Sequence, residues 1–322
     1  MKRNKTLKSL VGLALSASIL ASTTALAQVV SVSSIVEHPA LDSIRDGVKQ
    51  ALADAGYTED KGLKWQFQTA QGNTAIASQI ARKFVGDKSD VIVAISTPSA
   101  QAVVAATKSI PVLYSGVTDP VAAQLVPSWE PSKTNVSGVS DMLVLEKQLD
   151  LIKKVAPDAK TVGMVYNPGE ANSVVVVERL RELLSANDMN LVEATAARTV
   201  DVGAAARSLV GKADVFYTNT DNNVVSAFEA LVKVGNDSKI PIIASDTDSV
   251  GRGAIAALGV NYYDLGVQTG KMVVRVLKGE KPGDIASETS DQLELFVNPS
   301  AAAKQGVTLD EAFIQSATKI IE

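Results

Sequence analysis

The feature that most constrains the fold is a regular alternation of short β-branched runs with amphipathic stretches along most of the chain. Apolar residues recur with helical periodicity between the runs, for example over 41–55, 74–85, 173–185 and 224–234. This alternation is typical of an α/β protein, in which a parallel sheet is covered by helices on both faces. We predict strands at 29–36, 64–69, 91–96, 111–116, 135–139, 161–166, 191–194, 215–218, 241–245 and 254–259.

An internal echo predicts that the chain forms two lobes of similar build. Residues 90–99 (DVIVAISTPS) contain a strand, a polar turn and a helix start that lead to 110–119 (IPVLYSGVTD). Residues 214–223 (DVFYTNTDNN) repeat this order and lead to 240–248 (IPIIASDTD). The offset between the copies shifts from 124 to 130 residues, so a coincidence of short αβ pieces is the alternative. A chain of 322 residues is about twice the usual domain length and has room for two lobes.

Residues 1–27 are typical of a cleaved signal peptide. Four basic residues and no acid precede an apolar run over 10–20, well short of the ~20 residues that span a bilayer. The small residues Ala25 and Ala27 favour cleavage after Ala27 and a mature start at Gln28, with a membrane anchor as the alternative. The chain has no Cys to which a lipid could be attached. We therefore predict a free protein, not a lipoprotein, in the periplasm of a Gram-negative bacterium.

The scarcity of Cys and His excludes several classes of site. With no Cys and only His38, the chain cannot form a thiol nucleophile, an iron–sulfur cluster, a Cys-ligated zinc site or a multi-His metal site. We expect no metal and no cofactor. The 31 basic residues against 35 acidic ones give a net charge of −4, which argues against nucleic acid as a partner.

Short polar segments follow most of the predicted strands. In an open α/β sheet the ligand crevice lies beyond the carboxyl ends of the strands, where the amino ends of helices also point. We therefore expect ligand-binding residues, and no catalytic ones, at these ends. The candidates are Glu37, His38, Thr97, Ser99, Thr118, Asp119, Asn167, Asn172, Ser173, Thr220, Asp221, Asn222 and Asp246.

Two of these ends predict opposite charge preferences. Thr97-Pro98-Ser99 places Thr at a helix N-cap and Pro at the first helical position, so the free amides of that turn favour an anion such as a carboxylate. Asp221 and Asp246 are candidates for an ammonium partner. Helix capping by Thr97 or Asp221, and turn stabilisation by Asp246, are the alternatives.

A ligand side chain would need an apolar slot between the charged ends. The loop of Glu37 and His38 is one candidate, although a single His in a loop is more often merely exposed. Tyr residues in or beside strand ends could also contribute, with core packing as the alternative. They are Tyr114, Tyr166, Tyr217, Tyr262 and Tyr263.

Five motifs together resemble the ABC transporter substrate-binding family related to the tryptophan-binding protein TrpX. They are VEHPALD at 36–42, VTDPVAA at 117–123, YNPGEANS at 166–173, DTDSV at 246–250 and GVQTG at 266–270. The resemblance covers essentially the whole mature chain. It implies a type I periplasmic binding protein fold, in which two Rossmann-like lobes joined by three chain crossings close on one small solute. By this resemblance the N-terminal lobe contains 28–141 and 254–279, and the C-terminal lobe contains 142–253 and 280–322.

The function that the resemblance implies is binding of an amino acid, with Trp or Phe favoured, for an ABC importer. The partners would be a permease and its ATPase in the inner membrane, and the protein itself would be a monomer. Alternatives are a periplasmic sensor, or a binder of a branched-chain amino acid, nucleoside or sugar. An exported hydrolase or isomerase is disfavoured, because the chain has no Gly-x-Ser-x-Gly elbow and only His38 as a possible histidine base.

Overall fold

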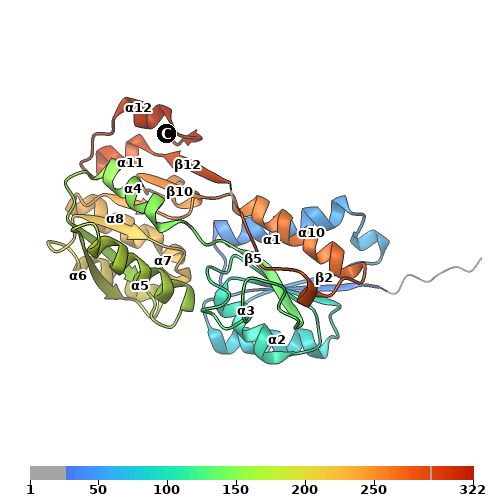
Figure 1. The fold of residues 1–322 in the computed structure, drawn as a ribbon. Helices are drawn as coiled ribbons and strands as arrows, with labels where there is room; N and C mark the ends of the chain where they lie inside the picture. Colours follow the sequence, from blue (N-terminus) through green and yellow to red (C-terminus); the bar gives the residue numbers. More distant parts are fainter. Residues whose placement is uncertain (1–26, 291) are drawn as a thin grey trace, which may run out of the picture.

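The computed structural model describes residues 27–290 and 292–322 as two lobes, each built around its own β-sheet (Figure 1). The predicted signal peptide lies almost entirely outside the described residues. Among those residues, none of the helices combines the length and the apolar character needed to cross a membrane.

The first lobe has a six-stranded sheet in the order β11-β5-β4-β3-β1-β2, and all its pairings are parallel. Its strands are β1 (Val29–Ser34), β2 (Lys64–Thr69), β3 (Val91–Ile95), β4 (Val112–Ser115), β5 (Val136–Ser140) and β11 (Glu288–Thr289). Its helices are α1 (Pro39–Asp54), α2 (Thr74–Gly86), α3 (Thr97–Ala106) and α10 (Tyr262–Leu277), with 3-10 turns η1 (Glu59–Lys61) and η3 (Pro282–Asp284). Strands β3, β4 and β5 are buried throughout, and the sequence of β3 (VIVAI) is accordingly an apolar run rather than an alternating pattern.

The second lobe has a seven-stranded sheet in the order β13-β12-β10-β9-β8-β6-β7. Its strands are β6 (Thr161–Tyr166), β7 (Asn190–Thr195), β8 (Val215–Thr218), β9 (Ile242–Ala244), β10 (Ala256–Val260), β12 (Leu293–Val297) and β13 (Lys319–Ile320). Its helical segments are α4 (Leu145–Val155), α5 (Ala171–Ser185), η2 (Thr199–Asp201), α6 (Val202–Ser208), α7 (Asn222–Ser226), α8 (Phe228–Ser238), α9 (Asp248–Gly251), α11 (Pro299–Lys304) and α12 (Glu311–Gln315). The pairing of β12 with β10 is antiparallel, so this sheet is parallel in all but one of its pairs.

Close packing holds α10 against α1, on the first lobe. A Cβ atom at Gly47 would lie 2.2 Å from the carbonyl oxygen of Tyr263, and one at Gly266 would lie 2.2 Å from that of Ile44. Only glycine lets two helix backbones approach this closely. The GVQTG motif of the sequence is therefore part of a helix–helix contact, and α10 belongs to the first lobe although it follows β10 of the second (Figure 1).

The sheet pairings correct the expected boundary between the lobes. Residues 254–259 were expected to return to the first lobe, but β10 pairs with β9 and β12 in the second sheet. Residues after 280 were expected in the second lobe, but β11 pairs with β5 in the first. The segment that returns to the first lobe therefore runs from about Tyr262 to Thr289. The residues of a buried apolar strand do not indicate which of two sheets the strand joins. The sequence alone therefore could not assign β10 to the second lobe.

Candidate functional site

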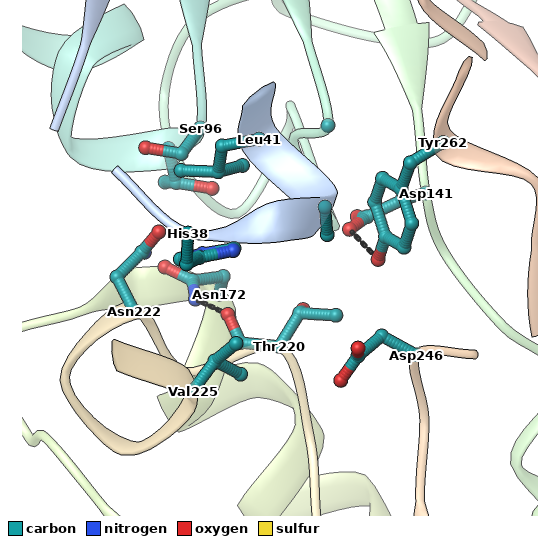
Figure 2. Close-up of a pocket in the computed structure, with 13 residues that line it drawn as sticks. His38, Leu41, Ser96, Asp141, Asn172, Thr220, Asn222, Val225, Asp246 and Tyr262 are labelled. Carbon is teal, nitrogen blue, oxygen red and sulfur yellow. Dashed lines mark hydrogen bonds between the residues drawn. The ribbon is translucent and has the colours of Figure 1, made fainter. Parts of the chain in front are cut away.

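A cavity lies between the carboxyl ends of the two sheets. Both lobes contribute to its wall, and Figure 2 shows their side chains converging on the same space. The lining residues are His38, Ala40, Leu41, Ser96, Thr97, Gly116, Asp141, Asn172, Thr220, Asn222, Val225, Asp246 and Tyr262. The position agrees with the expected crevice beyond the strand ends.

The amino end of α3 forms the donor-rich part of the cavity. Ser96 is the N-cap of this helix, instead of Thr97 as predicted, and its side chain makes no capping bond. The first helical bond runs from the amide of Ala100 to the carbonyl of Ser96 at 3.0 Å, so the amides of Thr97 and Ser99 precede it. Ser96 and Thr97 are only 3% and 1% exposed. Their hydroxyls have no hydrogen-bond partner among the described residues. This end of the helix can therefore donate to an anion.

Ser96 has a backbone conformation that is unusual for its residue type. Its φ of 75° and ψ of 159° lie in a region that glycine occupies almost alone. Such strain costs about 1–3 kcal/mol and persists only where the surroundings hold it. In this structure the Ser96 amide donates to the carbonyl of Ser115 on the neighbouring strand at 2.9 Å, which ties the strained residue to the sheet.

Two buried carboxylates form the acidic part of the cavity, one from each lobe. Asp141 follows β5 and accepts hydrogen bonds from the Thr118 and Tyr262 hydroxyls, both at 3.0 Å. Asp246 follows β9 and accepts from the amide and hydroxyl of Ser249 at 2.9 and 2.7 Å. Figure 2 shows Asp141 with Tyr262 on one side of the cavity and Asp246 on the other.

Burial raises the pKa of both Asp141 and Asp246 above the usual value, and the charge of Asp246 raises that of Asp141 further. Neither carboxylate has a salt bridge to any of residues 27–290 and 292–322. Two buried acids that lack a cation and face the same space favour a cationic ligand group between them.

The amides of Asn172 and Asn222 form the second-lobe wall beside Thr220. The Asn172 nitrogen donates to the carbonyl of Thr220 and to Glu170 Oε2, both at 3.1 Å. The Asn222 side-chain nitrogen donates to the same Glu170 oxygen at 2.5 Å. The oxygen of Asn172 is buried and has no partner within the described residues.

His38 lies at the start of α1, between Leu41 and Asn222 (Figure 2). Burial lowers its pKa to about 3, and the positive charge of Arg252 adds to this effect. The imidazole is therefore neutral at physiological pH. It can pack on an apolar group or share a hydrogen bond, but it cannot supply a positive charge to a carboxylate. Ala40, Leu41 and Val225 add apolar surface next to it.

The structure brings His38, Thr97, Asn172, Thr220, Asn222 and Asp246 together, as the sequence predicted for the crevice. The Asp221 side chain does not line the cavity. It caps α7 by accepting from the amides of Asn223 and Val224, and its other oxygen accepts from the amide of Asn167 and the hydroxyl of Ser173 at 2.7 and 2.6 Å. The carboxylate of Asp221 is thus fully used within the second lobe, together with Asn167 and Ser173.

The remaining predicted residues lie around the cavity. Asp119 forms an ion pair with Arg179 of α5 at 2.5 Å, which links the two lobes. Thr118 borders an adjoining space that shares Asp141 and Thr220 with the main cavity. Ser99 is buried within α3, and Glu37 is exposed.

The Tyr residues divide between the cavity and its surroundings. Only Tyr262 of the five lines the main cavity, and Tyr217 lines the adjoining space. Tyr114 is buried in the core of the first lobe, whereas Tyr263 is exposed.

Sequence reasoning named Tyr262 only as one of five Tyr residues that could form an apolar slot, and it did not include Asp141, Ser96 or Glu170 among the ligand-binding candidates. Asp141 stands directly after a strand, so the rule that found the other candidates also applies to it. Tyr262 opens a helix that returns from the second lobe, and no local signal reveals that return. Within the described residues, no group of three or more acidic or His side chains is arranged to hold a metal ion.

The fold and the cleft are those of a solute-binding protein. The family model for ABC transporter substrate-binding proteins matches residues 29–321. The chain belongs to this family, whose members are extracytoplasmic binding proteins with the type I periplasmic fold and not enzymes. It is 45% identical over 269 residues to a tyrosine-binding protein of Clostridioides difficile, covering 84% of this chain and 78% of that one.

Two solved structures show how the lobes compare with those of relatives. A Streptococcus pneumoniae ABC domain in complex with L-Trp is 32% identical, with a TM-score of 0.88, covering 91% of this chain and 99% of that one. A ligand-free, open substrate-binding protein from Clostridium difficile is 41% identical but has a TM-score of 0.69, covering 92% and 99%. The lower score at higher identity indicates that the lobes here stand closer to the arrangement of the tryptophan-bound relative.

Proposed function

We propose that this protein binds an aromatic amino acid as a zwitterion in the cavity between its lobes and delivers it to an ABC permease. The observation that carries the proposal is the pairing of a donor-rich end with an acidic end in one buried cavity. Neutral sugars and nucleosides would leave the two carboxylates without a charge partner, which is costly in a buried site.

The carboxylate of the ligand would bind at the amino end of α3. The hydroxyls of Ser96 and Thr97 lack partners in the described residues, and the free amides of Thr97 and Ser99 belong to the positive end of a ten-residue helix. An anion there satisfies donors that are otherwise buried without acceptors. The neutral His38 leaves the helix as the main source of positive potential.

The ammonium group of the ligand would bind between Asp141 and Asp246. Because these carboxylates come from different lobes, a cation between them attracts both and favours the closed arrangement. A ligand shifts a conformational equilibrium only through contacts that it makes in one state and not in the other. Contacts with both lobes meet that condition.

The ligand side chain would pack against the apolar part of the wall, formed by Leu41, Val225 and the neutral ring of His38. The names of the relatives support an aromatic side chain, because one is a tyrosine-binding protein and another was solved with L-Trp. We extend this ligand class to the present chain. We also propose a periplasmic location after removal of residues 1–27, and an ABC permease with its ATPase as the partners.

Isothermal titration of protein that has been unfolded and refolded to remove bound ligand tests the proposal. We expect L-Tyr, L-Trp or L-Phe to bind, whereas glucose and adenosine should not. Tyramine lacks the carboxylate and 3-(4-hydroxyphenyl)propionate lacks the ammonium group. Each should bind at least about 100-fold more weakly than L-Tyr, a loss of about 3 kcal/mol. Binding of a sugar or nucleoside in place of every amino acid would overturn the proposal.

Uptake measurements separate transport from sensing. Cells that lack the gene should take up less radiolabelled tyrosine at low external concentration, and the normal gene should restore uptake. Unchanged uptake together with a lost transcriptional response to the amino acid would instead identify a sensor.

A further inference from the structure

One buried carboxylate holds both asparagines of the cavity wall, although it does not line the cavity itself. Glu170 is 4% exposed and occupies the N-cap position of α5. Its side chain makes no capping bond to that helix. It reaches instead toward Asn172, the second residue of α5, and toward Asn222, the first residue of α7.

Every hydrogen-bond partner of the Glu170 carboxylate is a donor. Oε2 accepts from the side-chain nitrogen of Asn172 at 3.1 Å, and from the backbone and side-chain nitrogens of Asn222 at 3.1 and 2.5 Å. Oε1 accepts from the side-chain nitrogen of Asn167 at 3.4 Å. This set of donors matches an ionised carboxylate, which only accepts.

Such an arrangement determines which way each amide faces. The two ends of an Asn amide have nearly the same size and differ in hydrogen bonding, so a neighbour that only accepts selects the nitrogen. With its nitrogen committed to Glu170 and to the carbonyl of Thr220, Asn172 turns its oxygen away from them. That oxygen is buried, lines the cavity and has no partner within the described residues.

We propose that Glu170 is a positioning residue that makes Asn172 present its oxygen to the cavity, so that this wall accepts a hydrogen bond from the ligand. The inference rests on the proposed function and names the ligand group that the wall selects, an N–H or O–H donor. An acceptor at the same place would face the asparagine oxygen and bind poorly.

The position of Glu170 is costly for stability, which separates a role in binding from a role in folding. It is buried beside the carboxylate of Asp221, and both effects raise its pKa to about 7. A neutral amide of the same shape would avoid burying this charge. The substitution Glu170→Gln should therefore leave the melting temperature unchanged or raise it, and it keeps an acceptor oxygen for the two asparagines. Glu170→Met removes both the charge and the acceptor, so it should harm ligand binding without lowering the melting temperature.

The test compares Glu170→Met with the wild-type protein by titration with L-tyrosine at pH 8. Met has no oxygen acceptor, so the Asn172 nitrogen loses one of the two acceptors that hold it. We expect about a tenfold loss of affinity without a lower melting temperature. The controls are Glu170→Gln, whose amide oxygen can still accept from both asparagines, and Glu178→Met on the exposed face of the same helix, and both should bind nearly as wild type does.

A double-mutant comparison distinguishes positioning from general damage. Asn172→Ala removes the oxygen that Glu170 orients, and should itself weaken binding. In that background Glu170→Met should cost no more than about threefold, because the Asn172 amide that Glu170 orients is already gone. Full additivity, or unchanged binding by either single variant, overturns the inference. If wild-type protein binds no amino acid, the proposed function fails instead.

Discussion

The two copies of the internal echo build the same strand, turn and helix, but they treat the amino end of the helix in opposite ways. In the first copy, β3 leads into α3 through Ser96, whose side chain makes no capping bond. In the second copy, β8 leads into α7 through Asp221, whose carboxylate accepts from the amides of Asn223 and Val224. One helix end is left free, and the other is closed by its own chain.

This difference shows how similar lobes come to hold the opposite charges of a ligand. The free end of α3 offers donors to an anion, whereas an anion at α7 would compete with Asp221 for the same amides. The second lobe contributes acceptors to the cavity instead, from Asp246 and from the oriented oxygen of Asn172. Two lobes of similar build can therefore offer donors on one side of the cavity and acceptors on the other.

The largest effect is expected when a carboxylate is placed at the amino end of α3, so that both helix starts carry one. Thr97→Asp adds only one heavy atom to the side chain and places a negative charge where we propose that the ligand carboxylate binds. Repulsion in this buried place should reduce affinity for L-tyrosine by more than about 100-fold, which is about 3 kcal/mol. Isothermal titration measures the loss.

Thr97→Ser is the matched control, because it keeps the hydroxyl and adds no charge. It should stay within about threefold of wild type. If Thr97→Asp binds tyrosine as the wild type does, the amino end of α3 does not hold the carboxylate.

The echo and the strand ends were visible in the sequence because they depend on local patterns. Helix capping also depends on local sequence, yet the sequence did not show which helix start has its free amides already bound by a side chain. Asp221 and Asp246 both follow a strand, and only the contact of Asp221 with Ser173 and the Asn167 amide, about 50 residues away, shows that its carboxylate is occupied. Likewise, Tyr262 joins Asp141 across 121 residues. Partners so distant in sequence are set by tertiary packing.

The same contrast predicts that the two aspartates of the second lobe have different roles. Asp246→Asn removes a charge that faces the cavity, and should weaken tyrosine binding by about 10-fold to 100-fold with little change in melting temperature. Asp221→Asn removes a cap that several donors share. It should lower the free energy of unfolding by about 0.5–2 kcal/mol or more, with the smaller effect on affinity. Isothermal titration measures the loss of affinity in each variant, and thermal unfolding measures the loss of stability. Equal losses of affinity in the two variants would contradict the different roles.

Lowering the pH should raise the stability of the ligand-free protein and lower its affinity for the ligand. The raised pKa values of Glu170, Asp141 and Asp246 mean that the folded protein holds protons that the unfolded chain has released. For Glu170 this stabilisation is complete below about pH 4.5 and is lost as the pH rises through about 7. The ligand-free protein should therefore unfold at a higher temperature at pH 6 than at pH 8.

Affinity should instead fall as the pH is lowered, because protonation of Asp141 or Asp246 removes the negative charge that attracts the ammonium group of the ligand. His38 stays neutral between pH 8 and pH 6, so it does not contribute. Titration of the wild type and Asp246→Asn at several pH values measures this effect. The variant should show the shallower dependence, and an equally steep one would contradict this role of Asp246.

The smallest expected effect concerns the ion pair between Arg179 and Asp119, which joins the lobes outside the cavity. Its Asp119 side chain is almost buried, but that of Arg179 is 49% exposed, so solvent screens the attraction. Exposed pairs contribute about 0.2–1 kcal/mol, which limits the loss of affinity in Arg179→Gln to about fivefold. Because the pair forms only when the lobes meet, the loss should shrink at high salt. Titration at about 0.05 M and 0.5 M salt measures this, and a salt-independent loss would mean that Arg179 acts through packing within α5.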